Sequence, residues 1–431
     1  MNTNDKFIER TKLYFEDKYE LFLNTLNNPK TQGLFLNTNK AKKEVIFELI
    51  DFNIIDSNLN PNGYYHENDN IGKSKAYELG LIYPQDVESS FSASLVKKDD
   101  VKLIVDLCAA PGGKSINFIN KYPNTFCISN DINYKRATIL ASNLERLGLD
   151  RTYITSKKPD DFIYCLQGNT DIVILDAPCS GEGMIRKYPE ILDNYSIDSI
   201  NELAEIQKDL LEVAYKLIKK NGIIVYSTCT YALEEDENQV LYFLDKHKDI
   251  ELIHIDNKDN YSKLDGTIKL CPLNNTEGQF IAIFKKNSNL YSTKQRYLKS
   301  IKNKLVDDFI KDNLNIDSYY LYNDKDKFYL SFEPLLDLGY KVIRKGIYLG
   351  DIIKNRFEPN HNLYRSNSLI NKYKKIYDLN DKEYQDYVLG KELKVKLDNG
   401  YYLITYKNLS LGFGKVSNNT LKNKYPKGLR Q

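Results

Sequence analysis

The feature that most constrains this 431-residue chain is an alternation of short apolar runs and amphipathic segments that begins at Val101. Four apolar runs, at residues 101–107, 126–130, 171–176 and 223–227, read as buried strands, and helical patterns separate them. Strands that alternate with helices form parallel sheets with helices on both faces. The sequence therefore predicts an α/β fold built on a parallel, doubly wound sheet.

Shorter patterns predict the elements around this alternation. Apolar residues recur at three- and four-residue spacing over 200–220, which predicts the clearest helix, and the Asn-Gly pair at 221–222 is typical of a left-handed helix end. Near the N-terminus we expect amphipathic helices over residues 7–26 and a short strand at 34–36. Residues 83–86 predict a turn in the connector that leads to the sheet.

The alternation fades beyond the last predicted strand. Residues 287–345 read as a small mixed region, and residues 346–431 carry short strand patterns typical of a compact β-rich module. Two of these patterns, at 393–397 and 401–406, are joined by Asp-Asn-Gly at 398–400, which is a strong hairpin signal.

Composition excludes several classes of protein. No apolar run reaches the roughly 18 residues of a membrane span, and no basic segment followed by an apolar stretch marks a secretory signal. The six cysteines form no CxxC pair and have no histidine at ligand spacing, which argues against a zinc site and a disulfide framework. We therefore expect a cytoplasmic chain with no membrane partner and no bound metal.

The charge of the chain is divided unequally along its length. The net charge is +2, but residues 287–431 hold 27 Lys and Arg against 16 Asp and Glu, a net charge of +11. The preceding residues therefore carry about −9. The basic part is also rich in tyrosine, and cations mixed with aromatic rings suit a phosphate backbone and its bases. A merely soluble surface is the alternative explanation.

A loop of small residues, 108–115 (CAAPGGKS), follows the first predicted strand of the sheet. Its two glycines allow the backbone to turn tightly and to approach a ligand closely. The dinucleotide pattern GxGxxG is absent, and a phosphate-binding P-loop is excluded because Cys108 stands where that motif needs glycine. The loop favours a nucleotide-like ligand without a triphosphate, and Lys114 is a candidate contact for that ligand or for RNA.

Asp131 closes the second predicted strand. A carboxylate at this position can accept hydrogen bonds from both ribose hydroxyls of an adenosine, as the acidic residue of dinucleotide-binding folds does. An acid after a strand is more often a turn residue or a helix cap, but the loop that precedes it here favours the ribose contact.

Two cysteines follow apolar runs of the predicted sheet, Cys179 after residues 171–176 and Cys229 after residues 223–227. Ligands bind beyond the carboxyl ends of such strands, so both thiols are candidates for chemistry. A thiolate that adds to carbon 6 of cytosine makes carbon 5 able to attack a methyl sulfonium, and a second group must then help release the thiol. Asp176 is placed to contact N3 of the ring. On this reasoning either thiol can be the nucleophile, and burial in the core is the alternative for each.

Several segments resemble the signature motifs of a known family, the Nop/Sun RNA cytosine-5 methyltransferases, and occur in the family's order. They are residues 106–115 (DLCAAPGGKS), 175–184 (LDAPCSGEGM) and 226–231 (YSTCTY) followed by Glu237-Asn238. The tail is similar to the C-terminal module of the bacterial RsmF group at residues 347–351 (IYLGD), 356–359 (RFEP), 411–415 (LGFGK) and 422–430 (KNKYPKGLR). The resemblance covers nearly the whole chain and is weakest over residues 1–70 and 287–335.

The resemblance implies S-adenosylmethionine as the methyl donor, Cys229 as the nucleophile and Cys179 as the thiol needed for release. It implies a Rossmann-like methyltransferase domain at 96–286, an N-terminal extension and connector at 1–95 on the RNA-binding face, a linking domain at 287–345 and a PUA-like RNA-binding module at 346–431. The residues expected to hold the cofactor are Cys108, Ala109, Ala110, Pro111, Gly112, Gly113, Lys114, Asp131 and Asp176.

The chain departs from the family pattern in two places. Some members have an acidic residue on the adenine side of the cofactor where this chain has Lys158, and Ser156, Asp160 or Asp161 are the substitutes that we expect. Residues 85–90 also differ from the family pattern, and we expect them to pack beside the site regardless.

The expected function is methylation of cytosine carbon 5 in RNA by a monomeric enzyme, with 16S ribosomal RNA or the small ribosomal subunit as its partner. Transfer RNA is the alternative substrate, since the family contains enzymes for both. A non-catalytic RNA-binding factor of ribosome assembly is a third hypothesis, and the intact motifs argue against it.

Overall fold

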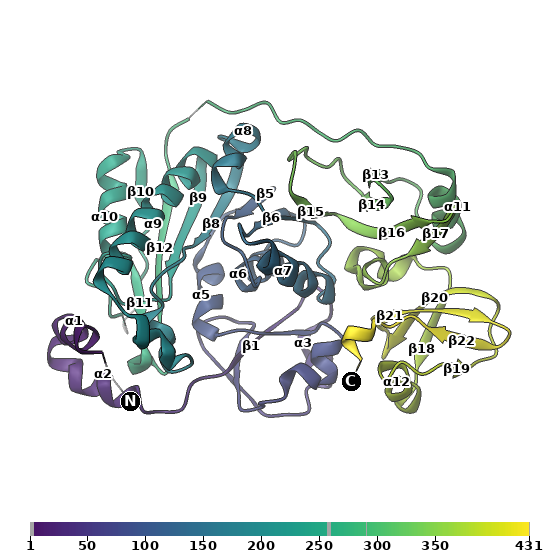
Figure 1. Ribbon diagram of the computed structural model, residues 1–431, viewed down its shortest axis with the longest axis horizontal. Coiled ribbons are helices and arrows are strands. Elements are labelled where there is room, and N and C mark those ends of the chain that lie inside the picture. The colour runs from purple at the N-terminus through teal and green to yellow at the C-terminus, as the bar shows by residue number, and fades with distance from the viewer. Residues whose placement is uncertain (1–3, 257–259, 290, 431) are drawn as a thin grey trace.

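The structure, a computed structural model, describes residues 4–256, 260–289 and 291–430. Its centre is a nine-stranded sheet in the order β10-β12-β9-β8-β5-β6-β7-β15, with β11 beside β12 (Figure 1). The five strands from β9 to β7 in this order are parallel, and the others are antiparallel. The bounds are β5 (Leu103–Asp106), β6 (Phe126–Asn130), β7 (Thr152–Thr155), β8 (Thr170–Asp176), β9 (Ile218–Thr228), β10 (Ile250–Leu252), β11 (Ile268–Leu270), β12 (Gln279–Lys286) and β15 (Val342–Lys345).

The strands expected at the centre of this sheet are confirmed. β6 spans the predicted residues, β8 and β9 contain their predicted runs, and β5 covers residues 103–106 of the run predicted at 101–107. Parallel pairing sets Asp106 opposite Ile174, and Asp176 opposite Ser227, so the carboxyl ends of β5, β8 and β9 meet at one edge of the sheet. The small-residue loop and both cysteines follow the strands at that edge.

Helices cover both faces of the sheet, as a doubly wound fold requires (Figure 1). Apolar side chains of α6 (Gly113–Lys121) and α7 (Tyr134–Arg146) pack with Ile104 and Ile172 on one face. Side chains of α8 (Ile163–Leu166), α9 (Ile197–Leu217) and α10 (Glu237–Lys246) pack with Val173 and Leu175 on the other. The α/β prediction is therefore confirmed.

The predicted end of the helix over 200–220 is wrong. α9 ends at Leu217, and Asn221 lies inside β9, where the pairing with β8 shifts register between Thr170 and Ile172. Asn221 does have the left-handed φ of +59° that an Asn-Gly pair favours. A residue with a left-handed backbone conformation occurs at strand irregularities as well as at helix ends, and the local sequence does not distinguish the two.

The N-terminal region begins with the helices α1 and α2 and continues into a small antiparallel sheet in the order β2-β3-β1-β4, which is accompanied by α3, α4 and α5. The helices and the strand at 34–36 are confirmed, but the turn expected at 83–86 is wrong because residues 82–84 form β4 and pair with β1. β4 is an edge strand, and an edge tolerates Pro84. The bounds are α1 (Asp5–Phe15), α2 (Tyr19–Thr25), β1 (Gly33–Leu36), α3 (Lys43–Phe47), β2 (Ile54–Asp56), β3 (Gly63–His66), α4 (Lys75–Glu78), β4 (Ile82–Pro84) and α5 (Val87–Leu95).

The expected domain boundary between residues 345 and 346 falls inside a sheet. β14 pairs with β16 across that boundary, so both belong to one sheet in the order β13-β14-β16-β17. β15, which precedes the boundary, instead joins the central sheet beside β7. The bounds are α11 (Lys304–Asn313), β13 (Tyr320–Asp324), β14 (Lys327–Ser331), β16 (Ile347–Ile353) and β17 (Arg356–Pro359).

The chain ends in a five-stranded sheet in the order β18-β20-β21-β22-β19. The hairpin expected around 398–400 is wrong, because β19 pairs with β22 while β20 pairs with β18 and β21. Tight hairpin turns lie instead at Lys407-Asn408, with φ angles of 51° and 61°, and at Asn418-Asn419, with φ angles of 52° and 58°, and such angles match the twist of paired strands. The bounds are β18 (Ile376–Leu379), α12 (Asp381–Val388), β19 (Leu393–Lys394), β20 (Gly400–Tyr406), β21 (Leu409–Ser417) and β22 (Thr420–Asn423).

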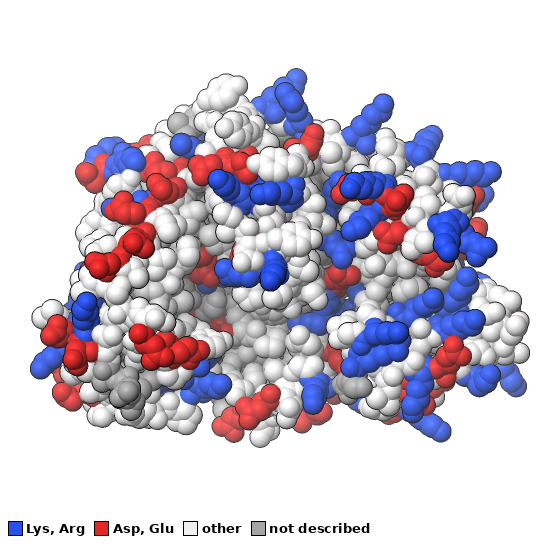
Figure 2. Space-filling view, viewed as in Figure 1, with Lys and Arg blue, Asp and Glu red and all other residues white. Residues whose placement is uncertain are grey.

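The surface reflects the uneven charge of the sequence. Lys and Arg side chains gather over the C-terminal sheets, on the right of Figure 2, and acidic side chains are more frequent over the helices at the left. Within the described ranges, no helix is long and apolar enough to cross a membrane.

Candidate active site

The loop between β5 and α6 makes the tight turn that its small residues predict. Gly112 has a φ of +124°, which favours glycine, and a Cβ there would lie 3.0 Å from Leu140 Cδ1. α6 begins at the next residue, so the backbone of 108–114 wraps around the carboxyl end of β5.

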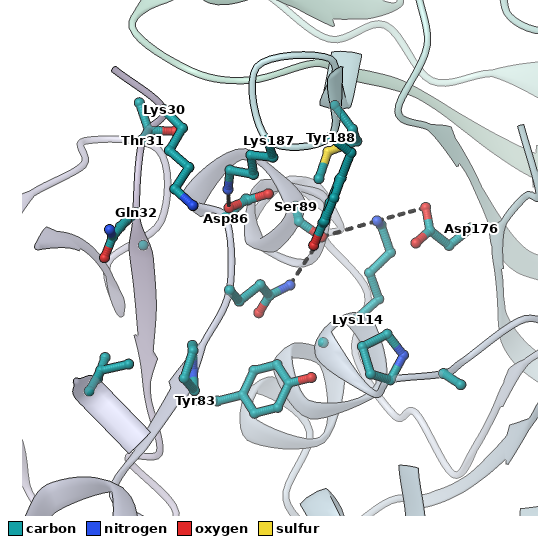
Figure 3. A pocket seen from close by; sticks show the side chains of 18 of the residues that line it. Lys30, Thr31, Gln32, Tyr83, Asp86, Ser89, Lys114, Asp176, Lys187 and Tyr188 are labelled. Carbon is teal, nitrogen blue, oxygen red and sulfur yellow. Dashed lines mark hydrogen bonds and ion pairs between the residues drawn. The ribbon is translucent and has the colours of Figure 1, made fainter. Parts of the chain in front are cut away.

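A cavity of about 640 Å³ opens beside this loop (Figure 3). One wall consists of expected cofactor-binding residues, namely Cys108, Ala109, Ala110, Pro111, Gly113, Lys114 and Asp176. The opposite wall comes from the N-terminal sheet and the connector, and includes Gln32, Tyr83, Gln85, Asp86 and Ser89. The expectation that residues 85–90 pack beside the site is therefore confirmed.

Lys114 fixes a carboxylate at the edge of the cavity. Its ammonium group forms an ion pair with Asp176 at 2.7 Å and donates to Ser89 Oγ at 3.2 Å (Figure 3). Ser227 Oγ donates to the same Asp176 oxygen at 2.8 Å. The Lys114 side chain is buried and that of Asp176 is 39% exposed, so the lysine supports the carboxylate from within.

Asp106 is a second carboxylate of the cavity, and sequence reasoning did not single it out. It is fully buried, and Ser115 Oγ donates to its Oδ2 at 2.7 Å. Its Oδ1 has no partner in the part of the chain that the structure describes. Burial raises the pKa of Asp106 to about 7. This oxygen is therefore available to a donor on a bound ligand.

The two thiols meet at the edge of the sheet. Cys179 Sγ lies 3.3 Å from Cys229 Sγ, and the backbone N–H of Cys229 donates to Cys179 Sγ at 3.3 Å. The contact with Cys229, together with burial, raises the pKa of the Cys179 thiol well above its usual value. Neither cysteine is among the described residues that line the cavity, and Asp176 is the predicted residue that connects the two places.

Two buried acids connect the loops that carry the thiols. Glu182, on the Cys179 loop, accepts from the backbone N–H of Tyr231 at 3.0 Å. Glu235, on the Cys229 loop, accepts from the backbone N–H of Ser180 and from Gln207 Nε2, each at 3.0 Å. Each loop therefore supplies a carboxylate to the other. Sequence reasoning missed both acids, although Glu182 lies within the segment 175–184 that carries the family resemblance.

A buried lysine stabilises the segment behind Cys229. The ammonium group of Lys269 lies 2.8 Å from Asp236 and 2.9 Å from Glu237, and all three side chains are almost completely buried. Thr228 Oγ1 also donates to Asp236 at 2.5 Å. No local signal marks Lys269, because its acidic partners lie more than thirty residues earlier in the chain.

Asp131 lies at the expected strand end but does not line the cavity. It is buried, accepts from the backbone N–H of Asn133 at 2.9 Å and lies 3.4 Å from Arg136 Nη1. Gly112 also lies outside the cavity lining. The role of Asp131 toward a ribose stays a prediction.

The candidates for the adenine side are not brought together. Ser156 Oγ donates to the carbonyl oxygen of Ile132 at 3.1 Å, and Asp160 lies in the 3-10 helix η3 (Pro159–Phe162). Asp161 lines a different cavity of about 600 Å³. These contacts therefore also stay predictions. Within the described ranges, no group of three or more His, Cys, Asp or Glu is arranged to hold a metal ion.

Family models match four parts of the chain. Residues 93–285 match the model of 16S rRNA methyltransferase RsmB/F, and residues 3–87 match the N-terminal domain of 16S rRNA methyltransferase RsmF. Residues 308–365 match the first C-terminal domain of the RsmF rRNA methyltransferase, and residues 374–431 match the methyltransferase RsmF PUA domain. The last two matches divide the C-terminal part between its two sheets, in agreement with the pairing of β14 with β16.

Individual proteins are similar over long stretches. Ribosomal RNA small subunit methyltransferase F of Aliivibrio fischeri is 27% identical over 83% of this chain and 81% of its own length. Ribosomal RNA small subunit methyltransferase B of Yersinia enterocolitica is 30% identical over 57% of this chain and 58% of its own. The crystal structure of NSun6 from Pyrococcus horikoshii with SFG is 21% identical, has a TM-score of 0.58 and covers 65% of this chain and 98% of that chain, which shows a shared fold.

Proposed function

We propose that this chain, which belongs to the RsmB/F family of methyltransferases, methylates carbon 5 of cytosine in 16S ribosomal RNA. The observation that carries the proposal is the pair of thiols 3.3 Å apart at the carboxyl ends of two adjacent parallel strands. A covalent route to carbon 5 needs a thiol that attacks and a second group that assists release. The two thiols lie next to a carboxylate that lines a ligand-sized cavity.

The cavity beside the β5–α6 loop fits S-adenosylmethionine. Its volume of about 640 Å³ falls within the range of roughly 300–1,000 Å³ for small-molecule sites. The unpartnered oxygen of Asp106 suits a hydrogen-bond donor such as the amino group of the cofactor. We expect Asp106, Asp131, Asp176 and the backbone of 108–114 to hold it. When bound, S-adenosylmethionine supplies the electrophilic methyl group that is transferred to carbon 5 of cytosine.

Cys229 is the proposed nucleophile, as the motif resemblance implies. Its Sγ forms a bond to carbon 6 of cytosine, which makes carbon 5 nucleophilic. After carbon 5 is methylated, a base removes the proton there, and the bond between carbon 6 and Cys229 Sγ breaks. Asp176, which Lys114 and Ser227 fix in place, is the proposed contact for ring N3.

The environment of Cys179 supports this division of roles. Because its pKa is raised, Cys179 is a neutral thiol at neutral pH and can donate a hydrogen bond. Its sulfur lies 3.3 Å from Cys229 Sγ, within hydrogen-bond distance of the proposed nucleophile. The same proximity allows Cys179 to assist release of Cys229.

The choice of 16S ribosomal RNA rests on the relatives and on charge. Matching family models and similar proteins are named for 16S or small-subunit ribosomal RNA. The net charge of +11 over residues 287–431 suits a phosphate backbone.

A covalent-trapping experiment tests the proposal. Cys179→Ala, expressed in bacterial cells and purified under denaturing conditions, should carry covalently attached RNA that sequencing assigns to 16S ribosomal RNA. Cys179→Ala/Cys229→Ala should carry none, and Cys165→Ala serves as the control for loss of a half-buried thiol elsewhere. Transfer RNA in the adduct would reassign the substrate. If an active wild-type enzyme gave no adduct in the Cys179→Ala variant, the roles of the thiols would be rejected.

A further inference from the structure

A second large cavity lies where all parts of the chain meet. Its volume is about 730 Å³, and it shares no lining residue with the cavity beside the β5–α6 loop. Its walls come from the 3-10 helices η2 (Ile71–Lys73) and η7 (Asn362–Arg365), from α4, α7 and β15, and from the C-terminal segment 425–430. Its lining includes five Lys and Arg side chains (Lys73, Arg146, Arg344, Arg365 and Arg430), one histidine (His361) and two acids (Glu78 and Glu145).

Arg365 is 2% exposed, and main-chain oxygens hold its guanidinium group. Nη1 donates to the carbonyl oxygens of Ser410 at 3.0 Å and Leu411 at 2.9 Å. Nη2 donates to those of Glu78 at 2.9 Å and Arg146 at 2.5 Å. These bonds join η7 to β21, α4 and α7 but leave the positive charge without a carboxylate. Nε has no partner within the described ranges.

Arg146 is held in the same manner. Nη1 donates to the carbonyl oxygens of Tyr77 at 2.8 Å and Ile82 at 3.0 Å, and the guanidinium group lies 3.6 Å from the centre of the Tyr77 ring. Its Nε and Nη2 are buried and have no partner among the described residues. Burial lowers the pKa of Arg146 to about 10. Two of its nitrogen groups are therefore left without an acceptor.

Lys40 adds a third cation to this junction. Its Nζ donates to the carbonyl oxygen of Ser410 at 3.3 Å. Burial, and then the charges of Arg365 and Arg146, lower the pKa of Lys40 well below its usual value. In the part of the chain that the structure describes, none of these three cations lies within 4.0 Å of a carboxylate oxygen.

The two acids of the cavity offset only part of this charge: they act on Arg365 through space, but burial still lowers the pKa of Arg365. Glu145 lies 3.4 Å from Arg344, and Glu78 accepts a hydrogen bond from the Tyr384 hydroxyl. Cations gathered away from water without a counter-charge cost free energy, and an anion that enters the cavity removes that cost. The arrangement differs from an ordinary ion-pair network because the acids are already engaged elsewhere.

We propose that this junction cavity binds a phosphate group. Guanidinium groups match the geometry of phosphate oxygens, and Arg146 has two nitrogens that still lack an acceptor. Lys73 and Arg430 line the same cavity, and both residues keep part of their surface exposed to solvent. If the chain acts on RNA as proposed above, this phosphate belongs to the RNA backbone. The RNA would then be bound where the N-terminal sheet, the central domain and the C-terminal segment meet.

The first experiment uses the full-length protein and inorganic phosphate. Phosphate should raise the unfolding temperature above that in chloride at equal ionic strength, because a ligand of the native state stabilises it. Lys73→Gln/Arg430→Gln should weaken phosphate binding by at least about tenfold, since two charge-assisted contacts are lost. Lys422→Gln/Lys424→Gln removes the same charge from exposed positions outside the cavity and should keep the wild-type shift.

The second experiment distinguishes RNA-borne phosphate from a free anion. Binding of a 16S ribosomal RNA transcript is measured over a series of KCl concentrations. Lys73→Gln/Arg430→Gln should lower the slope of log K against log salt by about 1.4, the value for two phosphate contacts on a single strand. The RNA should also abolish the stabilisation by inorganic phosphate. If phosphate stabilises the protein but RNA neither competes nor changes the slope, the ligand of the cavity is a free anion.

Equal stabilisation of the wild type and Lys73→Gln/Arg430→Gln, or no effect specific to phosphate, would overturn the proposal. This outcome is separable from a failure of the catalytic assignment. Cys229→Ala should lose methyl transfer and keep the phosphate-dependent shift, because Cys229 does not line the junction cavity.

Discussion

The loops that carry the two thiols differ from the junction cavity in whether their buried charges have partners. Behind the thiols, Glu182 and Glu235 each accept hydrogen bonds from the neighbouring loop, and Lys269 lies between two acids. At the junction, Arg146 and Arg365 are held by carbonyl oxygens and have no acidic partner in the described ranges.

This difference separates a completed network from a site that lacks its counter-ion. Where each charge has a partner, removal of one leaves the other buried and unpaired, so the cost is large. Where like charges are gathered, removal of one relieves repulsion, so the cost is small and ligand binding is what changes. The two regions should therefore respond differently to the loss of a single charge.

The largest effect is expected for Cys229→Ala. Methyl transfer to RNA should fall at least about 10³-fold, or ~4 kcal/mol of activation free energy, because the attacking thiol is gone. Incorporation of labelled methyl groups into 16S ribosomal RNA measures it, with Cys165→Ala as the control. A variant that keeps more than about a tenth of the wild-type rate would exclude Cys229 as the nucleophile.

Lys269→Met tests the completed network. It leaves Asp236 and Glu237 buried without their cation, so the free energy of unfolding should fall by about 3–5 kcal/mol. Lys263→Met is the matched control, because Lys263 pairs with Glu16 at the surface and should cost at most about 1 kcal/mol. Denaturant unfolding of both variants measures the difference, and equal losses would contradict the comparison.

Asp106→Asn tests the effect of a buried carboxyl group, one oxygen of which has no hydrogen-bond donor among the described residues. Its pKa of about 7 in the folded chain exceeds the value of about 4 in the unfolded chain, so the folded state binds the proton more tightly. The wild type should therefore lose stability as pH rises from about 4 to about 7, on the order of 2–4 kcal/mol relative to Asp106→Asn. Unfolding free energies at several pH values test this, and parallel curves for the two proteins would disprove it.

Asp131→Ala tests the predicted ribose contact. The affinity for S-adenosylmethionine should fall by about tenfold, as expected for loss of a hydrogen bond to a charged group. Calorimetric titration measures the affinity, and Asp245→Ala, which removes an exposed acid on α10 outside the cavity lining, is the control. An unchanged affinity for Asp131→Ala would show that this acid serves to order the start of α7 through Asn133 and Arg136.

The smallest effect is expected for Arg146→Met. It removes two hydrogen bonds to carbonyl oxygens but relieves repulsion with Arg365 and Lys40, so the net loss of stability should be about 1 kcal/mol or less. Denaturant unfolding without phosphate measures this loss. A loss as large as that of Lys269→Met would show that the junction is a completed network after all.

Local sequence predicted the central strands well and the turns poorly. β6 matches its predicted residues because a short apolar run of this kind has the length of a strand and is shorter than a typical helix. The helix end predicted at Asn221 and the hairpin predicted at 398–400 were wrong, because residues with positive φ occur at helix ends, in bulges and in hairpins alike. The hairpins that do form turn at Lys407-Asn408 and at Asn418-Asn419.

The candidate site also divides into residues that the sequence could place and residues that it could not. The small-residue loop, Asp176 and both thiols could be placed at one sheet edge, because parallel strands bring their carboxyl ends together. Glu235 and Lys269 could not be found in this way, because each is defined by partners in another segment. Asp131 also lies outside the cavity lining and contacts Asn133 and Arg136, which the strand pattern does not predict.

By itself, then, the sequence determined four strands at the centre of the sheet, the motifs at their edge and the family, since these depend on residues close together in the chain. Only the tertiary structure decided that the two sulfur atoms lie 3.3 Å apart. It also brought together Lys40, Arg146 and Arg365, which are more than one hundred residues apart in the chain. The physical reason is that charges from distant segments become neighbours only when the domains pack, and their cost or use is fixed by what surrounds them there.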